Sequence, residues 1–137
     1  MSIYPIQYVR LQADTIGNCF LLSARDNIDS DDFCKQFLTS EWGISILTDN
    51  KMIEFSDYHY MYEGLTINLK FKSGKHYNDD ILYYTGYLYK YWVSVFNDDP
   101  RYIYKIAPIR LIANRFNFYH TQDWNYVIED IKSRPYK

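Results

Sequence analysis

Arg115 and His120 are the two residues whose types and spacing best suit catalysis. The arginine stands five residues before the histidine, and the histidine falls at the end of a predicted helix. Histidine transfers protons near neutral pH, and the guanidinium group of arginine holds phosphate oxygens. A purely structural interpretation competes with this one. In it, Arg115 is a solvated or ion-paired helix residue, and His120 is a C-terminal cap that the helix dipole favours.

In a helical domain, this spacing resembles the Arg-x4-6-His element of HEPN ribonucleases. The resemblance implies that His120 would handle protons on a 2′-hydroxyl group and that Arg115 would hold the scissile phosphate. Sites of this family usually pair across a dimer. The chain has six arginines and three histidines, so the spacing also arises readily by chance. A small ribonuclease is therefore the alternative hypothesis.

No other residues have the spacing of a catalytic or metal-binding motif. His59, His76 and His120 are far apart and form no HxH or HxxxH pair. The five glycines are scattered singly, so the chain has no glycine-rich phosphate loop. Cys19 and Cys34 belong to no CxxC or CxxH pair, and we expect both to be buried free thiols. We therefore expect neither a metal nor a cofactor.

The tyrosines of the chain suggest a different role, which is contact with another protein. The chain has 16 tyrosines, and they are densest between Tyr58 and Tyr91. Each ring offers a large contact area at low entropic cost and keeps a hydroxyl group for the boundary with water. Such residues are enriched at protein–protein interfaces. We expect the contact surface to consist of Tyr58, Tyr60, Tyr62, Tyr83, Tyr87, Tyr89 and Trp92.

The composition indicates one folded domain without a strong electrostatic field. The chain of 137 residues has the size of a single domain, residues 1–137, and is 47% hydrophobic and 23% charged. Its net charge of −2, with both signs interleaved, argues against nucleic acid or an anionic membrane as partner. No basic region with an apolar core opens the chain, and no run of 18 apolar residues occurs. We expect a cytoplasmic protein.

The clearest predicted helix spans residues 78–97. Asn78 caps it, Asp79 and Asp80 stand at the positive end of its dipole, and Pro100 follows its end. Residues with helical spacing predict a buried stripe of Ile81, Leu82, Thr85, Leu88, Tyr91, Trp92 and Val95. The residues expected to flank this stripe or to point away from it are Tyr83, Tyr87, Tyr89 and Lys90.

Helical patterns also dominate the rest of the chain. They cover residues 5–23, a segment that starts at Asp29, and residues 57–63, 101–106, 108–119 and 124–132. For the first of them, two strands at residues 6–11 and 19–22 are the competing interpretation. Around Ser40 the second helix either continues or breaks. Ser56 would cap the helix at 57–63, and Gly64 would close it.

Residues 66–72 alternate between apolar and polar side chains, which suggests a short strand or an extended arm. The predicted fold class is mainly α: a compact single-domain bundle of about five to six helices with this one additional element.

Aromatic and turn residues recur in segments 37–40, 47–49, 55–58, 80–92, 103–105, 119–123 and 128–129. These segments are similar to a loosely described group of small bacterial proteins encoded near toxin–antitoxin modules. The resemblance runs from Phe37 onward, roughly over residues 37–132. It implies a cytosolic protein of a bacterium or phage that acts in a conflict system, as the neutralising partner or as the effector.

We therefore expect a protein–protein interaction module, an antitoxin-like component for example, rather than an enzyme. The contact would be with a protein partner or with a second copy of the chain. The competing hypotheses are the HEPN-like ribonuclease that uses Arg115 and His120 and a structural homo-oligomer whose tyrosines pair with each other.

Overall fold

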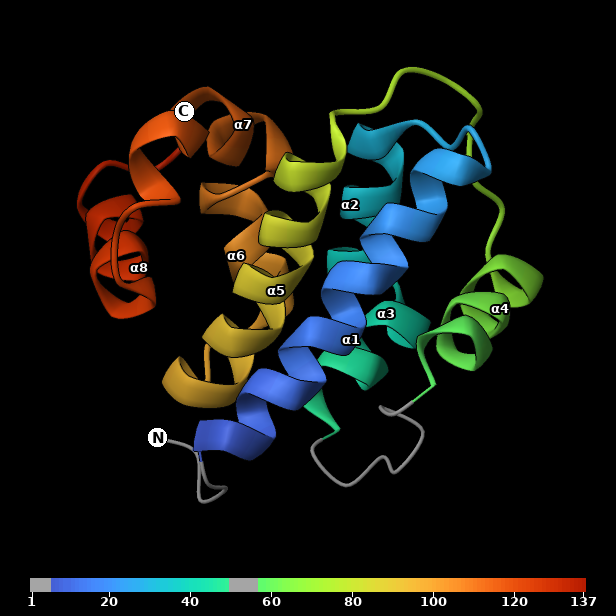
Figure 1. The fold of residues 1–137 in the computed structure, drawn as a ribbon, viewed down its shortest axis with the longest axis horizontal. Helices are drawn as coiled ribbons and strands as arrows, with labels where there is room; N and C mark the ends of the chain where they lie inside the picture. The colour runs from blue at the N-terminus through green and yellow to red at the C-terminus, as the bar shows by residue number, and fades with distance from the viewer. Residues whose placement is uncertain (1–5, 50–56) are drawn as a thin grey trace.

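Short polar side chains begin most of the helices. Asp29, Ser40, Asp57, Asn78 and Asp99 each accept a hydrogen bond from a backbone N–H group in the first turn that follows. The computed structural model describes residues 6–49 and 57–137. The helices in these ranges are α1 (Ile6–Arg25), α2 (Ser30–Thr39), α3 (Glu41–Thr48), α4 (Tyr58–Asn68), α5 (Asp79–Phe96), α6 (Pro100–Ile106), α7 (Ile109–Tyr119) and α8 (Trp124–Ser133) (Figure 1).

The prediction of a mainly helical protein is confirmed, but the predicted number of helices is too low. The described ranges contain eight helices and no strand. Ser40 accounts for one of the additional helices, because its extended backbone ends α2 while its side chain caps α3. The first segment is a continuous helix, so the alternative of two strands is wrong.

The prediction for residues 57–72 is wrong in its boundaries. Gly64 does not close α4, which continues to Asn68, so the predicted strand or extended arm at 66–72 is helical over its first three residues and forms no strand over the rest. A glycine inside a helix costs about 1 kcal/mol relative to alanine, and the complete burial of Leu65 at the next position offsets that cost. Asp57 caps the helix, whereas Ser56, the predicted cap, lies outside the described residues.

The two longest helices, α1 and α5, run antiparallel through the middle of the fold (Figure 1). Helices α2, α3 and α4 lie on one side of this pair, and α6, α7 and α8 lie on the other. Gly17 and Gly86 stand where α1 and α5 cross. A methyl group at Gly86 would lie 2.7 Å from the Ile16 carbonyl oxygen and 2.9 Å from the Gly17 Cα atom. The two backbones can approach this closely only because neither position carries a side chain.

Replacing Gly86 with alanine is expected to lower the free energy of unfolding by about 2 kcal/mol, because the new methyl group must push α1 away from α5. Gly64→Ala is the matched control. There the new methyl group would meet the Trp42 ring at 3.4 Å, an ordinary contact, so the better helix propensity should raise stability by up to about 1 kcal/mol. Urea denaturation followed by circular dichroism measures both variants. If both substitutions changed the free energy of unfolding by the same amount in the same direction, the close crossing of α1 and α5 would be contradicted.

Helix α5 is buried around more of its circumference than its apolar stripe predicted. Leu82, Thr85, Leu88, Tyr91 and Trp92 are buried as expected, whereas Ile81 and Val95 of the same predicted stripe are only partly buried. However, the side chains of Tyr89 and Lys90, expected to flank the stripe or to point away from it, are both completely inaccessible to solvent. The reason is that α1, α3, α6, α7 and α8 all pack against α5, so it has neighbours on several sides.

The C-terminal helix docks onto the core as predicted. Val127, Ile128 and Ile131 of α8 are fully buried, and they follow each other at helical spacing. In the described ranges, none of the helices combines the length and the apolar character needed to cross a membrane.

Candidate functional site

Four residues of the predicted contact surface form hydrogen bonds within the fold. The Tyr62 hydroxyl donates a hydrogen bond to Asp26 at 2.6 Å, and the Tyr83 hydroxyl donates one to Asp14. The Tyr89 hydroxyl donates to the Ala107 carbonyl oxygen at 2.7 Å, and the Trp92 indole N–H donates to Asp98 at 2.8 Å. Burial, followed by the hydrogen bond to a carboxylate, raises the pKa of Tyr62 and of Tyr83, so both phenols stay protonated donors.

Three of these predicted contact residues are therefore not available to a partner. Tyr89 and Trp92 are completely buried, and only 7% of Tyr62 is exposed. They cannot line a contact surface. Tyr58 is half-buried, with its ring stacked on His59 at a centroid distance of 4.3 Å. Of the predicted residues on α4, Tyr60 is the exposed one, at 61%.

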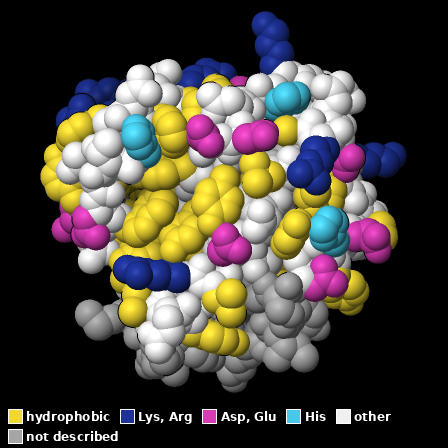
Figure 2. Space-filling view, viewed as in Figure 1, with side chains coloured by type: hydrophobic (Ala, Val, Ile, Leu, Met, Phe, Trp, Pro, Cys, Tyr) yellow, Lys and Arg dark blue, Asp and Glu magenta, His cyan; other side chains and the backbone are white. Residues whose placement is uncertain are grey.

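Tyr87 belongs to an aromatic cluster between α5 and α8, whereas Tyr83 lies against α1 and contacts Tyr87 at a centroid distance of 6.0 Å. The Trp124 ring stacks on Tyr87 with centroids 4.7 Å apart and planes 16° apart, and it also contacts Tyr84 at 4.7 Å and Tyr91 at 6.1 Å. Apolar side chains gather on this face of the molecule, and acidic side chains together with a basic one stand at the edge of the patch (Figure 2). The tyrosine rings of α5 half-bury Trp124. The cluster therefore mainly attaches α8 to the core.

The most exposed large apolar side chains near Tyr60 line a groove between α3 and α4, which we call the α3–α4 groove. Ile67 is 75% exposed, Tyr60 61% and Trp42 44%. The groove has a volume of about 410 Å³. Its lining residues are Trp42, Ser45, Ile46, Asp49, Tyr60, Met61, Glu63, Gly64, Ile67 and Asn68.

Local structure explains how the groove forms. Ser40 turns the chain between α2 and α3, and Gly43 packs so closely against the Phe37 carbonyl oxygen that a methyl group there would overlap with it. This junction sets α3 beside α4, where the Trp42 ring lies over the backbone at Gly64. Ile46 and Met61 are buried and form the floor. An apolar floor with exposed aromatic side chains is the arrangement that protein interfaces use.

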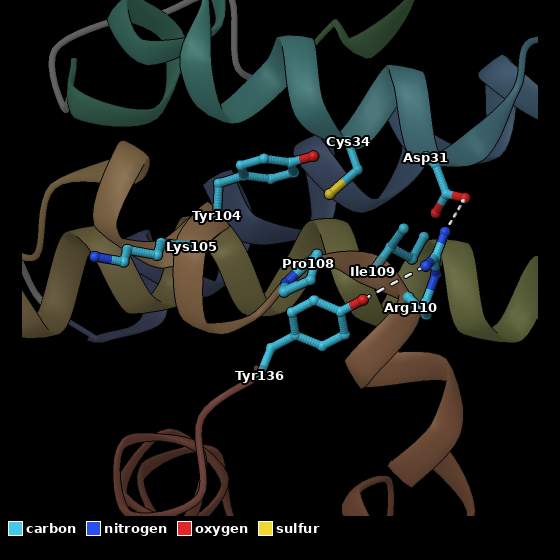
Figure 3. Close-up of a pocket in the computed structure, with 8 residues that line it drawn as sticks. All are labelled: Asp31, Cys34, Tyr104, Lys105, Pro108, Ile109, Arg110 and Tyr136. Atoms are coloured by element: carbon cyan, nitrogen blue, oxygen red, sulfur yellow. Dashed lines mark hydrogen bonds and ion pairs between the residues drawn. The ribbon is translucent and has the colours of Figure 1, made fainter.

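A second, smaller pocket of about 230 Å³ lies where α2, α6 and α7 meet the C-terminal segment (Figure 3). The Arg110 guanidinium lies between Asp31 and the Tyr136 hydroxyl, with its nitrogen atoms 3.4 Å from each partner. Cys34 is fully buried here, and burial raises the pKa of its thiol to about 12. A thiol that stays protonated is a poor nucleophile. Cys19 is also buried, so the prediction of two buried free thiols is confirmed.

The structure does not bring Arg115 and His120 together. Arg115 donates hydrogen bonds to the Tyr119 hydroxyl at 2.9 Å and to the Arg134 carbonyl oxygen at 2.8 Å, and it lines a hollow beside the C-terminal segment. His120 stacks on Phe116 at 4.9 Å and lines another hollow, together with Asp79 and Asp80. Five residues along a helix correspond to about 140° of rotation, so the two side chains leave α7 in different directions.

Within residues 6–49 and 57–137, no group of three or more histidine, cysteine, aspartate or glutamate side chains is placed to hold a metal ion. The described histidines, His59, His76 and His120, are all exposed and lie on different segments.

The sequence interpretation missed Trp42 and Ile67. Trp42 follows a helix cap, and Ile67 lay in a segment interpreted as a strand or arm. The helical spacing of Tyr60, Gly64 and Ile67 on one face of α4 was a usable signal. Comparisons of this chain with protein-family models, with curated proteins and with solved structures find no match. Its function therefore has to be inferred from the geometry.

Proposed function

We propose that the protein is a protein-binding module whose contact site is the α3–α4 groove. The observation that carries the proposal is the meeting of Trp42, Tyr60 and Ile67, three strongly exposed apolar side chains, at one groove with a buried apolar floor. Tryptophan and tyrosine contribute a large share of the binding energy at protein interfaces. Exposed apolar side chains that gather in one place mark interaction sites, whereas isolated ones do not.

An antitoxin-like role is part of this proposal and rests on the resemblance of residues 37–132. A neutralising partner acts by covering another protein, so it needs a contact surface and no catalytic residues of its own. The ribonuclease alternative gains no such support, because Arg115 bonds to its own helix and to the C-terminal segment and lines a different hollow from His120.

Affinity purification from the native host tests the proposal. The wild-type protein and its groove variant are each used as bait, and the proteins that they capture are compared. We expect Tyr60→Ala combined with Ile67→Ser to lose a partner that the wild-type protein captures, because truncating two central contact residues costs about 2 kcal/mol or more each. Both side chains are exposed, so the fold should persist. The measurement is the amount of each captured protein, quantified by mass spectrometry.

Tyr102→Ala combined with Phe118→Ser is the matched control, since these aromatic residues are 43% and 47% exposed and lie outside the α3–α4 groove. This control should capture the same partner as the wild-type protein. If the groove variant captured the partner as well as the wild-type protein does, the proposed contact site would be contradicted.

A further inference from the structure

The charged residues of the described ranges that line the α3–α4 groove are both acidic. They are Asp49, at the end of α3, and Glu63, on α4; among residues 6–49 and 57–137, no lysine or arginine lines the groove. Glu63 is exposed, and it forms no ion pair with any residue of the described ranges. Asp49 also acts on the buried Lys90, which lies behind α3. The groove thus presents an apolar floor with carboxylate groups on both of its walls.

The length of the walls limits what can fill the groove. Helix α3 has 8 residues and α4 has 11, which at 1.5 Å per residue gives walls of roughly 12 and 16 Å. A helix of two to three turns matches this length and can place apolar side chains at positions i, i+3 or i+4, and i+7 onto the floor. Trp42, Tyr60 and Ile67 supply the side-chain surface that such anchors contact.

We propose that the occupant is a short amphipathic helix of another protein, with lysine or arginine residues beside its apolar anchors. This inference rests on the proposed function and specifies the partner. Basic side chains would face Asp49 and Glu63 across the rim, where complementary charge favours the correct partner and raises the association rate. A second copy of this chain is disfavoured, because docking groove against groove in a symmetric dimer brings the carboxylates of both copies together.

Phage display of random 16-residue peptides tests the chemistry of the occupant. The immobilised wild-type protein selects peptides, and the Tyr60→Ala, Ile67→Ser variant, whose groove charge is unchanged, removes those that bind elsewhere. Both substitutions lie at exposed positions, so the fold should persist. We expect the remaining sequences to combine helically spaced apolar residues with an excess of lysine and arginine. Wild-type protein and variant should show the same circular dichroism spectrum.

Charge reversal then tests the role of Glu63. A selected basic peptide, labelled for fluorescence anisotropy, should bind Glu63→Lys about three- to tenfold more weakly than wild-type protein at low salt. Glu129→Lys carries the same charge change at an exposed position of α8 and should leave the affinity unchanged.

The outcomes separate this inference from the proposed function. If the selected peptides depend on the groove but are acidic or show no charge preference, the inference of a basic partner is overturned, while the proposed contact site stands. A dimer detected by sedimentation in the wild-type protein and lost in the Tyr60→Ala, Ile67→Ser variant also overturns it, in favour of a second copy. If no association of any kind depends on the groove, the proposed function fails as well.

Discussion

Tyr89→Ala is expected to lower the free energy of unfolding by about 3 to 5 kcal/mol, whereas Tyr87→Ala should lower it by only about 2 kcal/mol. The two tyrosines stand two residues apart on α5. Tyr89 is completely buried, and its hydroxyl lies 2.7 Å from the Ala107 carbonyl oxygen and 3.2 Å from the Cys34 sulfur. Truncating a large buried ring leaves a cavity, and here it also leaves a buried carbonyl group without its donor.

The smaller effect at Tyr87 follows from its position at the surface of the aromatic cluster. Its ring is half-buried and stacks on Trp124, and an aromatic pair of this kind contributes about 0.5 to 1.5 kcal/mol beyond the area that it buries. Chemical denaturation curves of both variants, followed by circular dichroism, give the two values.

Phenylalanine variants keep the test informative even if Tyr89→Ala does not fold. Tyr89→Phe keeps the ring and removes only the hydroxyl, so it should cost about 1 to 3 kcal/mol through the unpaired Ala107 carbonyl group. Tyr87→Phe should be close to neutral. The burial of Tyr89 would be contradicted if the alanine or the phenylalanine variant lost more free energy of unfolding at position 87 than at position 89.

Lys90 should make the stability of the protein depend on pH between about 7 and 10. Its side chain is completely buried on α5, and its ammonium group donates a hydrogen bond of 2.8 Å to the Leu47 carbonyl oxygen at the end of α3. Burial, opposed in part by the charge of Asp49, lowers the pKa of Lys90 from its ordinary 10.5 to about 7. A free amine and a charged ammonium group therefore coexist in the folded protein near neutral pH.

The direction of the pH effect follows from proton linkage. Below pH 7 Lys90 is charged in both the folded and the unfolded protein, and the cost of burying the charge is present in full. Between pH 7 and 10.5 the unfolded chain holds a proton that the folded protein lacks, so stability increases with pH. The increase from pH 7 to pH 9.5 should reach roughly 2 to 3 kcal/mol.

Denaturation midpoints of the wild-type protein and of Lys90→Met, measured from pH 7 to pH 9.5, check this expectation. Relative to the variant, the wild-type protein should gain stability as the pH rises, because methionine does not titrate. Lys35→Met, at an exposed position of α2, is the control and should follow the wild-type protein. Parallel curves for wild-type protein and Lys90→Met would show that Lys90 keeps an ordinary pKa in the folded state.

The helices themselves could be predicted because the signals that begin and end them are local. Asn78 caps α5 through a hydrogen bond to the N–H group of Ile81, three residues away, and Asp29 caps α2 in the same way through Asp32. The boundary that failed was decided by a distant contact. Gly64 is a helix-ending residue by propensity, yet the burial of Leu65 and the Trp42 ring beside Gly64 keep it inside α4.

The predicted contact surface was harder to place, because tyrosine suits the core and the surface equally well. A ring with a hydroxyl group can be buried wherever a partner for the hydroxyl lies nearby. Tyr62, Tyr83 and Tyr89 find those partners in other segments, at Asp26 after the end of α1, at Asp14 on α1 and at Ala107 after the end of α6. None of these pairs is visible in the sequence, since the partners lie between 18 and 69 residues away.

By itself, the amino-acid sequence determined that the protein is mainly helical, where α5 and most of the other helices run, and that both thiols are buried. These properties depend on apolar spacing and on capping residues within one or two helical turns. Only the tertiary structure decided which aromatic side chains are exposed. The close crossing at Gly86 and the crowding of α5 by its neighbours bury Tyr89 and Lys90. The turn at Ser40 sets α3 beside α4, and this placement leaves Trp42, Tyr60 and Ile67 exposed along one groove.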